Sequence, residues 1–114
     1  MRRLLIGVAG TIRQVAMAEG LPVRFEPPAR SANFVLDQLA LVVLEGQFGD
    51  RNLVVLGPAG DEVVRLGTTC GTGLIDQVLD IDGEIRVIEA TPRGDFQARI
   101  DLDSFELVRV AEWR

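Results

Sequence analysis

Residues 96–103, with the sequence FQARIDLD, contain the clearest secondary-structure signal in the chain. Apolar and polar residues alternate strictly here, and the apolar set is Phe96, Ala98, Ile100 and Leu102. Alternation with a period of two is the signature of a strand that is buried on one face. The pattern therefore predicts a strand whose apolar side chains face a core and whose polar side chains face water.

Turn residues extend this interpretation to the neighbouring segments. Asp82-Gly83 lies between two apolar, β-branched segments, and an Asp-Gly pair readily adopts the left-handed dihedrals of a type I′ hairpin turn. Residues 58–61 (PAGD) join the apolar segments 53–56 and 62–66 in a similar way. Frequent turns with short strands between them predict an all-β fold, an antiparallel meander of hairpins that is propeller-blade-like or sandwich-like.

One segment leaves an alternative open. Residues 33–44 are apolar for most of their length, and Asn33 can cap a helix. A helix at about 33–46 would make the fold α+β. The phenylalanine and the valines of this segment favour strand, which is the structure that we expect there.

The chain length and its short repeated motifs predict the domain organisation. A chain of 114 residues is the usual size of a single domain, so we expect one β-rich domain over residues 1–114. The motif Ile-x-Gln-Val occurs at 12–15 and 75–78, each time followed at the same spacing by an acidic residue and glycine. These echoes predict internal hairpin repeats around 11–34, 35–74 and 75–114.

The composition removes most catalytic chemistries. The chain has no His, no Lys and no Tyr, a single Cys (Cys70), and only Arg among its 12 basic residues. Without His it lacks the usual general base near neutral pH, and without Lys it cannot form a Schiff base. One Cys without His provides neither a structural zinc site nor an internal disulfide. We therefore expect a protein that is not an enzyme and that has no cofactor.

Positive and negative charges are concentrated in different segments of the chain, which indicates the kind of partner to expect. The net charge is −5, yet residues 1–30 carry five Arg against two Glu, and residues 76–106 carry nine acids against three Arg. These opposite charges favour a homo-oligomer or a protein partner, with Arg2, Arg3 and the large aromatic Trp113 as interaction residues. The sequence contains no basic patch with interleaved stacking aromatics, so we expect no nucleic-acid partner.

The apolar start of the chain bears on localisation. Residues 4–10 (LLIGVAG) form a short apolar run behind two arginines, which we interpret as a first core strand rather than a signal peptide. No segment approaches 18 uninterrupted apolar residues, so we expect no membrane span and a cytoplasmic location.

The strongest candidate for a metal site is the acidic segment around the Asp-Gly turn. Asp80, Asp82 and Glu84 are spaced by two residues, and positions i and i+2 of a strand share a face. Their hard oxygen ligands suit Ca²⁺, which makes a small-ligand or Ca²⁺-binding β domain the alternative function.

The Gly/Thr-rich residues 67–73 (GTTCGTG) lack the lysine of a phosphate-binding loop, and we expect a plain connection between hairpins. Cys70 has no His to activate it, so we expect a buried or unreactive thiol. Arg86 and Arg99 are expected on the outer face of the sheet, in cross-strand ion pairs with Glu84, Glu89 and Asp101.

Residues 52–66 (NLVVLGPAGDEVVRL) resemble the repeat of PQQ-like, quinoprotein-type β-propellers, which runs Asn, a short apolar strand, Asp, a turn with Gly, and a strand that ends near Trp and Arg. Here Gly57 stands at the Asp position of the repeat and Val64 at the Trp position. Residues 77–90 look like a pair of blade strands, and residues 96–107 look like the piece that follows, with Asp101 at the Asp position of the repeat. The same order of signals is found in small uncharacterised bacterial proteins that look like a propeller cut down to about two blades. The resemblance carries over no cofactor-binding residue.

Overall fold

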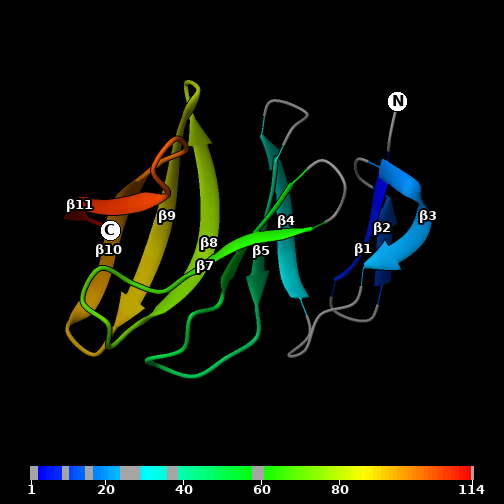
Figure 1. The fold of residues 1–114 in the computed structure, drawn as a ribbon. Helices are drawn as coiled ribbons and strands as arrows, with labels where there is room; N and C mark the ends of the chain where they lie inside the picture. Colours follow the sequence, from blue (N-terminus) through cyan, green and yellow to red (C-terminus); the bar gives the residue numbers. More distant parts are fainter. Residues whose placement is uncertain are drawn as a thin grey trace. The chain divides into compact units, whose positions relative to one another are not determined.

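The computed structural model describes residues 3–8, 11–14, 17–23, 29–35, 39–57 and 61–113 (Figure 1). All the regular structure in these ranges is β-strand, and the described residues contain no helix with the length and apolar character that a membrane span needs. The strands are β1 (Arg3–Val8), β2 (Thr11–Gln14), β3 (Met17–Val23), β4 (Ala29–Val35), β5 (Leu39–Leu44), β6 (Leu53–Leu56), β7 (Glu62–Leu66), β8 (Leu74–Ile81), β9 (Glu84–Thr91), β10 (Gly94–Asp101) and β11 (Glu106–Glu112). The expected all-β fold is therefore confirmed.

The chain divides into two compact units, and the chain passes between them more than once. The first unit comprises Met1–Glu45 and Leu53–Arg65, and the second comprises Gly46–Asn52 and Leu66–Arg114.

The first unit holds a sheet with the strand order β2-β1-β4-β5-β6-β7, in which β3 also pairs with β1. The pairs β4–β5 and β5–β6 are antiparallel, whereas β1 runs parallel to both β3 and β4. One face of β5 and β6 packs Val42, Leu44, Val54 and Leu56 together in a buried apolar cluster. The alternate residues of both strands are equally buried, which explains why these segments are continuously apolar rather than alternating.

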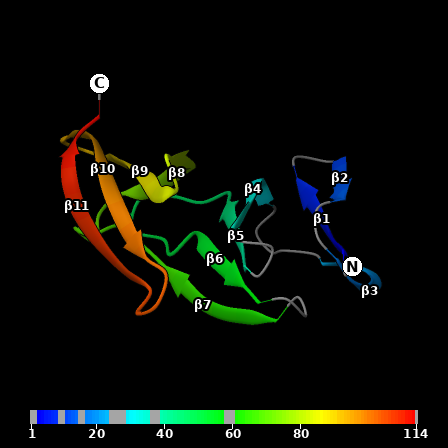
Figure 2. The ribbon, with the colours of Figure 1, turned by 90° about the horizontal axis from the view of Figure 1, so that it is seen from above.

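The second unit holds a four-stranded antiparallel sheet with the order β11-β10-β9-β8, so each strand pairs with its neighbour in sequence (Figure 2). Val78, Val87 and Ala98 lie opposite one another across β8, β9 and β10, and all three are buried. Burying each valine stabilises the fold by about 1.5–3 kcal/mol. This stack fixes the register of the hairpins, since a slip by one residue would turn every apolar side chain of a strand to the other face.

The Asp-Gly turn forms as predicted. Ile81 pairs with Glu84, and the two residues between them, Asp82 and Gly83, have φ angles of 52° and 85°. Positive φ at both central positions defines a type I′ turn, whose twist matches that of the flanking strands. The Asp80 carboxylate closes the turn by accepting a hydrogen bond of 2.8 Å from the Gly83 amide.

The expected strand over 96–103 is also confirmed, but it ends earlier than the alternation suggested. β10 stops at Asp101, because the Asp101 carboxylate accepts hydrogen bonds from the amides of Asp103 and Ser104, at 2.8 and 3.2 Å. An Asp that bonds to amides two and three residues ahead favours a turn. Leu102 therefore belongs to the turn and continues the alternating pattern only by coincidence.

The helical alternative at about 33–46 is wrong. The described residues of this segment lie in β4, in β5 and in the loop that begins after Leu44, while residues 36–38 lie outside the described part. β4 and β5 pair antiparallel, with Asn33 opposite Leu41. Residues 58–60 of the second predicted turn are not described, and the flanking strands β6 and β7 form where they were expected.

Candidate functional site

The loop between β7 and β8 is the most distinctive feature of the second unit. The Gly71 amide donates to the Thr68 carbonyl at 3.2 Å, which closes a turn with Thr69 and Cys70 at its centre. Gly71 has a φ of +74°, a conformation that glycine adopts without strain. The loop therefore presents Cys70 at the tip of a defined turn.

A buried carboxylate ties this loop to the sheet. Glu89, in the middle of β9, is 0% exposed. It accepts hydrogen bonds from both the amide and the hydroxyl of Thr69, the latter at 2.9 Å, and it pairs with Arg109 Nε of β11 at 3.3 Å. A buried charge is tolerated when it is paired and fully hydrogen-bonded, as Glu89 is here. The expectation that Glu89 pairs with Arg86 or Arg99 on the outer face is wrong: Glu89 is buried on the same face of β9 as Val87, and its ion-pair partner is Arg109.

The thiol of Cys70 differs from what the sequence predicted. The side chain is exposed rather than buried. The Thr72 hydroxyl donates to the Cys70 sulfur at 3.3 Å, and the Thr68 hydroxyl lies 3.5 Å from it. These hydroxyls, with smaller contributions from the Thr72 amide and Arg109, lower the pKa of Cys70 from 9.0 to about 6. This lowered pKa increases the fraction of Cys70 that is thiolate at neutral pH.

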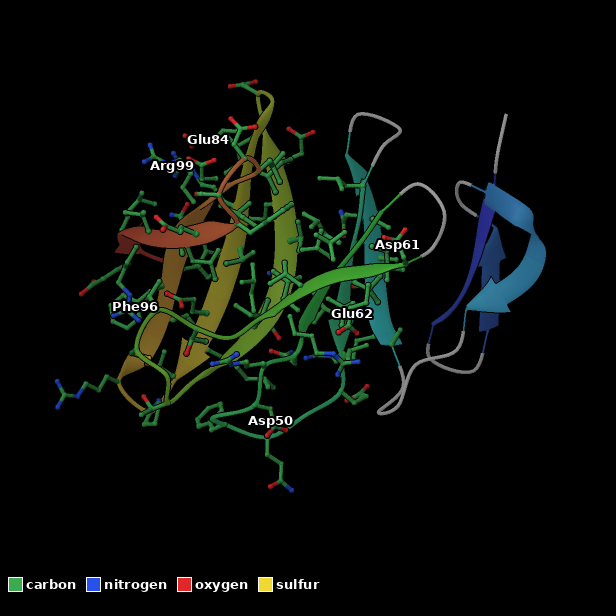
Figure 3. The ribbon with its side chains drawn as sticks, in the orientation of Figure 1. Asp50, Asp61, Glu62, Glu84, Phe96 and Arg99 are labelled. Carbon is green, nitrogen blue, oxygen red and sulfur yellow. The ribbon has the colours of Figure 1, made fainter. Side chains whose placement is uncertain are left out.

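Arg109 connects this thiol to an aromatic side chain on the same face of the sheet. Its guanidinium lies over the ring of Phe96, with a distance of 3.9 Å to the ring centroid. Figure 3 labels Phe96 on β10. A guanidinium over an aromatic face is stabilised by a cation–π interaction, and this contact fixes the position of the Arg109 charge.

A cavity of about 360 Å³ opens beside these groups. The described residues that line it come from the loop, from the β9–β10 turn and from β10 and β11: Cys70, Thr72, Thr91, Pro92, Arg93, Phe96 and Arg109. The lining combines an apolar wall, two guanidinium groups and one thiolate. It can bind a small molecule that has both an apolar part and a negatively charged part.

Sequence reasoning missed this constellation for a specific reason. The arginine that contributes to the lowered pKa of Cys70 is Arg109, which is not a sequence neighbour of the loop. Arg109 is 39 positions from Cys70 in the sequence. The threonines on both sides of Cys70 were the available signal, since hydroxyl groups stabilise a neighbouring thiolate by hydrogen bonding.

The acidic residues proposed as a metal site instead take part in the hairpin turn and in an ion pair. Asp80 bonds to the Gly83 amide, and Glu84 pairs with Arg86 Nε at 2.6 Å. Asp82 occupies the first central position of the type I′ turn. Among the residues that the structure describes, no group of three or more Cys, Asp or Glu side chains is arranged to hold a metal ion.

The two predicted outer-face arginines interact with two of the expected carboxylates, Glu84 and Asp101, but within one strand rather than across strands. Arg86 pairs with Glu84 of its own strand and donates to Gln97 of β10 at 3.0 Å. Figure 3 labels Glu84 and Arg99 near one end of this sheet. The amides of Asp103 and Ser104, with a smaller contribution from the Arg99 charge, lower the pKa of Asp101.

The edge strand β11 is the other candidate interaction feature. It lies at the end of the strand order and pairs with β10 along its length, with a bulge between Gln97 and Ala98 of β10. Val108, Val110 and Trp113 are 47%, 42% and 37% exposed. The Trp113 amide bonds to the Asp95 carbonyl at 2.9 Å, so the backbone is anchored while the indole stays partly exposed.

The remaining predicted interaction residues belong to the start of the chain. Arg3 begins β1, and Arg2 lies outside the described residues. Comparisons of the chain with protein-family models, with curated proteins and with solved structures gave no match.

Proposed function

We propose that this chain is a non-enzymatic, β-rich interaction domain that self-associates through the edge strand β11. The observation that carries the proposal is a seven-residue edge strand with two exposed valines and a partly exposed tryptophan beside it. An edge strand offers backbone N–H and C=O groups to another chain, and exposed apolar side chains favour this pairing.

The charges on β11 restrict the registers in which two copies can pair. If two copies pair antiparallel about a two-fold axis at Val108, then Val108 lies opposite its own copy and Leu107 lies opposite Arg109. In the same register Glu106 lies opposite Val110, so no like charges meet. An axis at Arg109 would instead place two guanidinium groups opposite each other, which is destabilising.

The test is the solution mass by size-exclusion chromatography with light scattering, at low and high salt. We expect the wild-type chain to be a dimer, and Val108→Lys to be a monomer because two ammonium groups would lie opposite each other. Val108 is about half exposed, so the change has little cost for the fold of the single chain.

Ile81→Lys is the matched control. Ile81 is an exposed apolar residue on β8, at the opposite edge of the same sheet. We expect this variant to remain a dimer. Dissociation of both variants would indicate head-to-tail pairing of β8 with β11 instead, and a monomeric wild type at both salt concentrations would refute self-association.

A further inference from the structure

We propose that the cavity beside Cys70 is a site of reversible S-thiolation, in which a small disulfide that carries carboxylate groups forms a mixed disulfide with Cys70. This inference goes beyond the proposed function and does not depend on self-association. It rests on the cavity, on the two arginines that line it and on the position of the sulfur.

The size and shape of the cavity indicate the kind of molecule. Its volume of about 360 Å³ lies at the lower end of the range for small-molecule sites. Pro92 and Phe96 provide an apolar wall, and the Thr91 hydroxyl is fixed by donating to the Gly94 carbonyl at 2.7 Å. A short peptide or amino-acid thiol would fit these surroundings, with aliphatic parts against the wall.

The charges indicate which molecules of this size are favoured. Arg93 and Arg109 line the cavity, and no carboxylate belongs to its described lining. Arg109 directs Nε to Glu89 and also interacts with the Cys70 sulfur, so Arg93 is the lining guanidinium that a ligand carboxylate would meet first. The Arg93 guanidinium has no ion pair with any residue that the structure describes. Guanidinium groups bind carboxylates with favourable geometry, so a ligand with carboxylates is selected.

The sulfur is placed for reaction with such a ligand. Cys70 is exposed at the cavity, and the Thr72 hydroxyl donates a hydrogen bond of 3.3 Å to its sulfur, which favours the thiolate. The thiolate attacks one sulfur of the small disulfide, a bond forms between the two sulfurs, and the original S–S bond breaks. The Cys70 sulfur is oxidised, the departing sulfur is reduced, and the departing thiolate takes a proton from water. Another small thiol reverses the step.

A mixed disulfide is the product that this chain can sustain. The sequence holds no second cysteine, so Cys70 cannot be resolved into an internal disulfide. Formation of the mixed disulfide by exchange with a small disulfide protects the sulfur from the irreversible steps of oxidation.

The experiment measures the rate of thiolation of the full chain by intact-mass spectrometry at neutral pH, with three disulfides of different charge. The probes are glutathione disulfide, which is acidic, hydroxyethyl disulfide, which is neutral, and cystamine, which is cationic. The chain carries a net charge of −5, so non-specific attraction would favour cystamine. We expect the opposite order, with glutathione disulfide fastest, because the cavity charges act locally. Equal rates, or a preference for cystamine, would overturn the proposal.

Arg93→Gln tests the source of this preference, and Arg99→Gln is the control with the same change in net charge. Arg99 is an exposed residue of β10 that does not line the cavity. We expect Arg93→Gln to lower the ratio of the rates with acidic and neutral disulfides by about two- to fivefold, the effect of one partly exposed ion pair. Arg99→Gln should leave the ratio unchanged. Equal effects of the two variants would overturn the role of the cavity.

Discussion

Replacement of the buried carboxylate by an amide, Glu89→Gln, is expected to destabilise the second unit by about 3 kcal/mol. In the wild-type chain the two hydrogen bonds from Thr69 reach the charged carboxylate of Glu89. Hydrogen bonds to a charged acceptor contribute about 1.5–3 kcal/mol each, against about 0.5–1.5 kcal/mol for a neutral acceptor. The two bonds reach different oxygens of Glu89, and glutamine keeps only one acceptor oxygen. One bond therefore becomes a bond to a neutral acceptor and the other loses its acceptor, at a cost of about 1 kcal/mol each. The pair with Arg109, whose side chain is 34% exposed, adds about 1 kcal/mol after allowance for solvent screening.

The assay is urea unfolding followed by the fluorescence of Trp113, the only tryptophan, which lies in the second unit. Glu84→Gln is the control, because Glu84 forms an ion pair with Arg86 but its side chain is 38% exposed. We expect this control to cost less than about 1 kcal/mol. If Glu89→Gln unfolds at the same urea concentration as the control, then the buried carboxylate does not anchor the loop and the reasoning fails.

Three further perturbations test the loop and the acidic hairpin. Thr72→Val removes the largest contribution to the lowered pKa of Cys70, so the inflection of the thiolation rate against pH should move from about 6 towards 9.0; an unmoved inflection would contradict the assigned cause. Gly73→Ala should lower the free energy of unfolding by about 1–3 kcal/mol, because the new Cβ would lie 2.5 Å from the Ala90 carbonyl oxygen. A stability equal to wild type would show that the loop can shift without loss of stability. Excess Ca²⁺ and excess chelator should give the same melting temperature, since two of the three candidate carboxylates already have hydrogen-bond or ion-pair partners, and a rise with Ca²⁺ would restore the metal-site hypothesis.

The sequence predicted the local structure of the second unit well because its signals are local. An Asp-Gly turn and an alternating strand depend on neighbouring residues, and both formed where they were predicted. The end of β10 was misplaced, because the side chain of Asp101 competes with continuation of the strand. Short-range hydrogen bonds of this kind are not visible in a hydrophobic pattern.

The environment of Cys70 could not be predicted from the same signals. Arg109 reaches Glu89 only because β11 pairs with β10 and β10 pairs with β9, and the register of both pairings is needed to place it. The burial of Glu89 depends on the same registers. Sequence patterns identify strands better than they identify which residues of different strands meet, so this site became visible only in three dimensions. The propeller resemblance and the internal repeats remain predictions.

The three crossings of the chain between its units have a practical consequence for dissecting the protein. Asn52 belongs to the second unit, where its side-chain amide donates to the Ile75 carbonyl at 2.7 Å and accepts from the Ile75 amide at 2.9 Å. The Gly49 amide also bonds to the Gly73 carbonyl at 2.9 Å. A truncation that begins at Leu66 would therefore remove a segment of its own unit. After a single proteolytic cut between residues 58 and 60, the two fragments should stay associated on a gel-filtration column and separate only in denaturant.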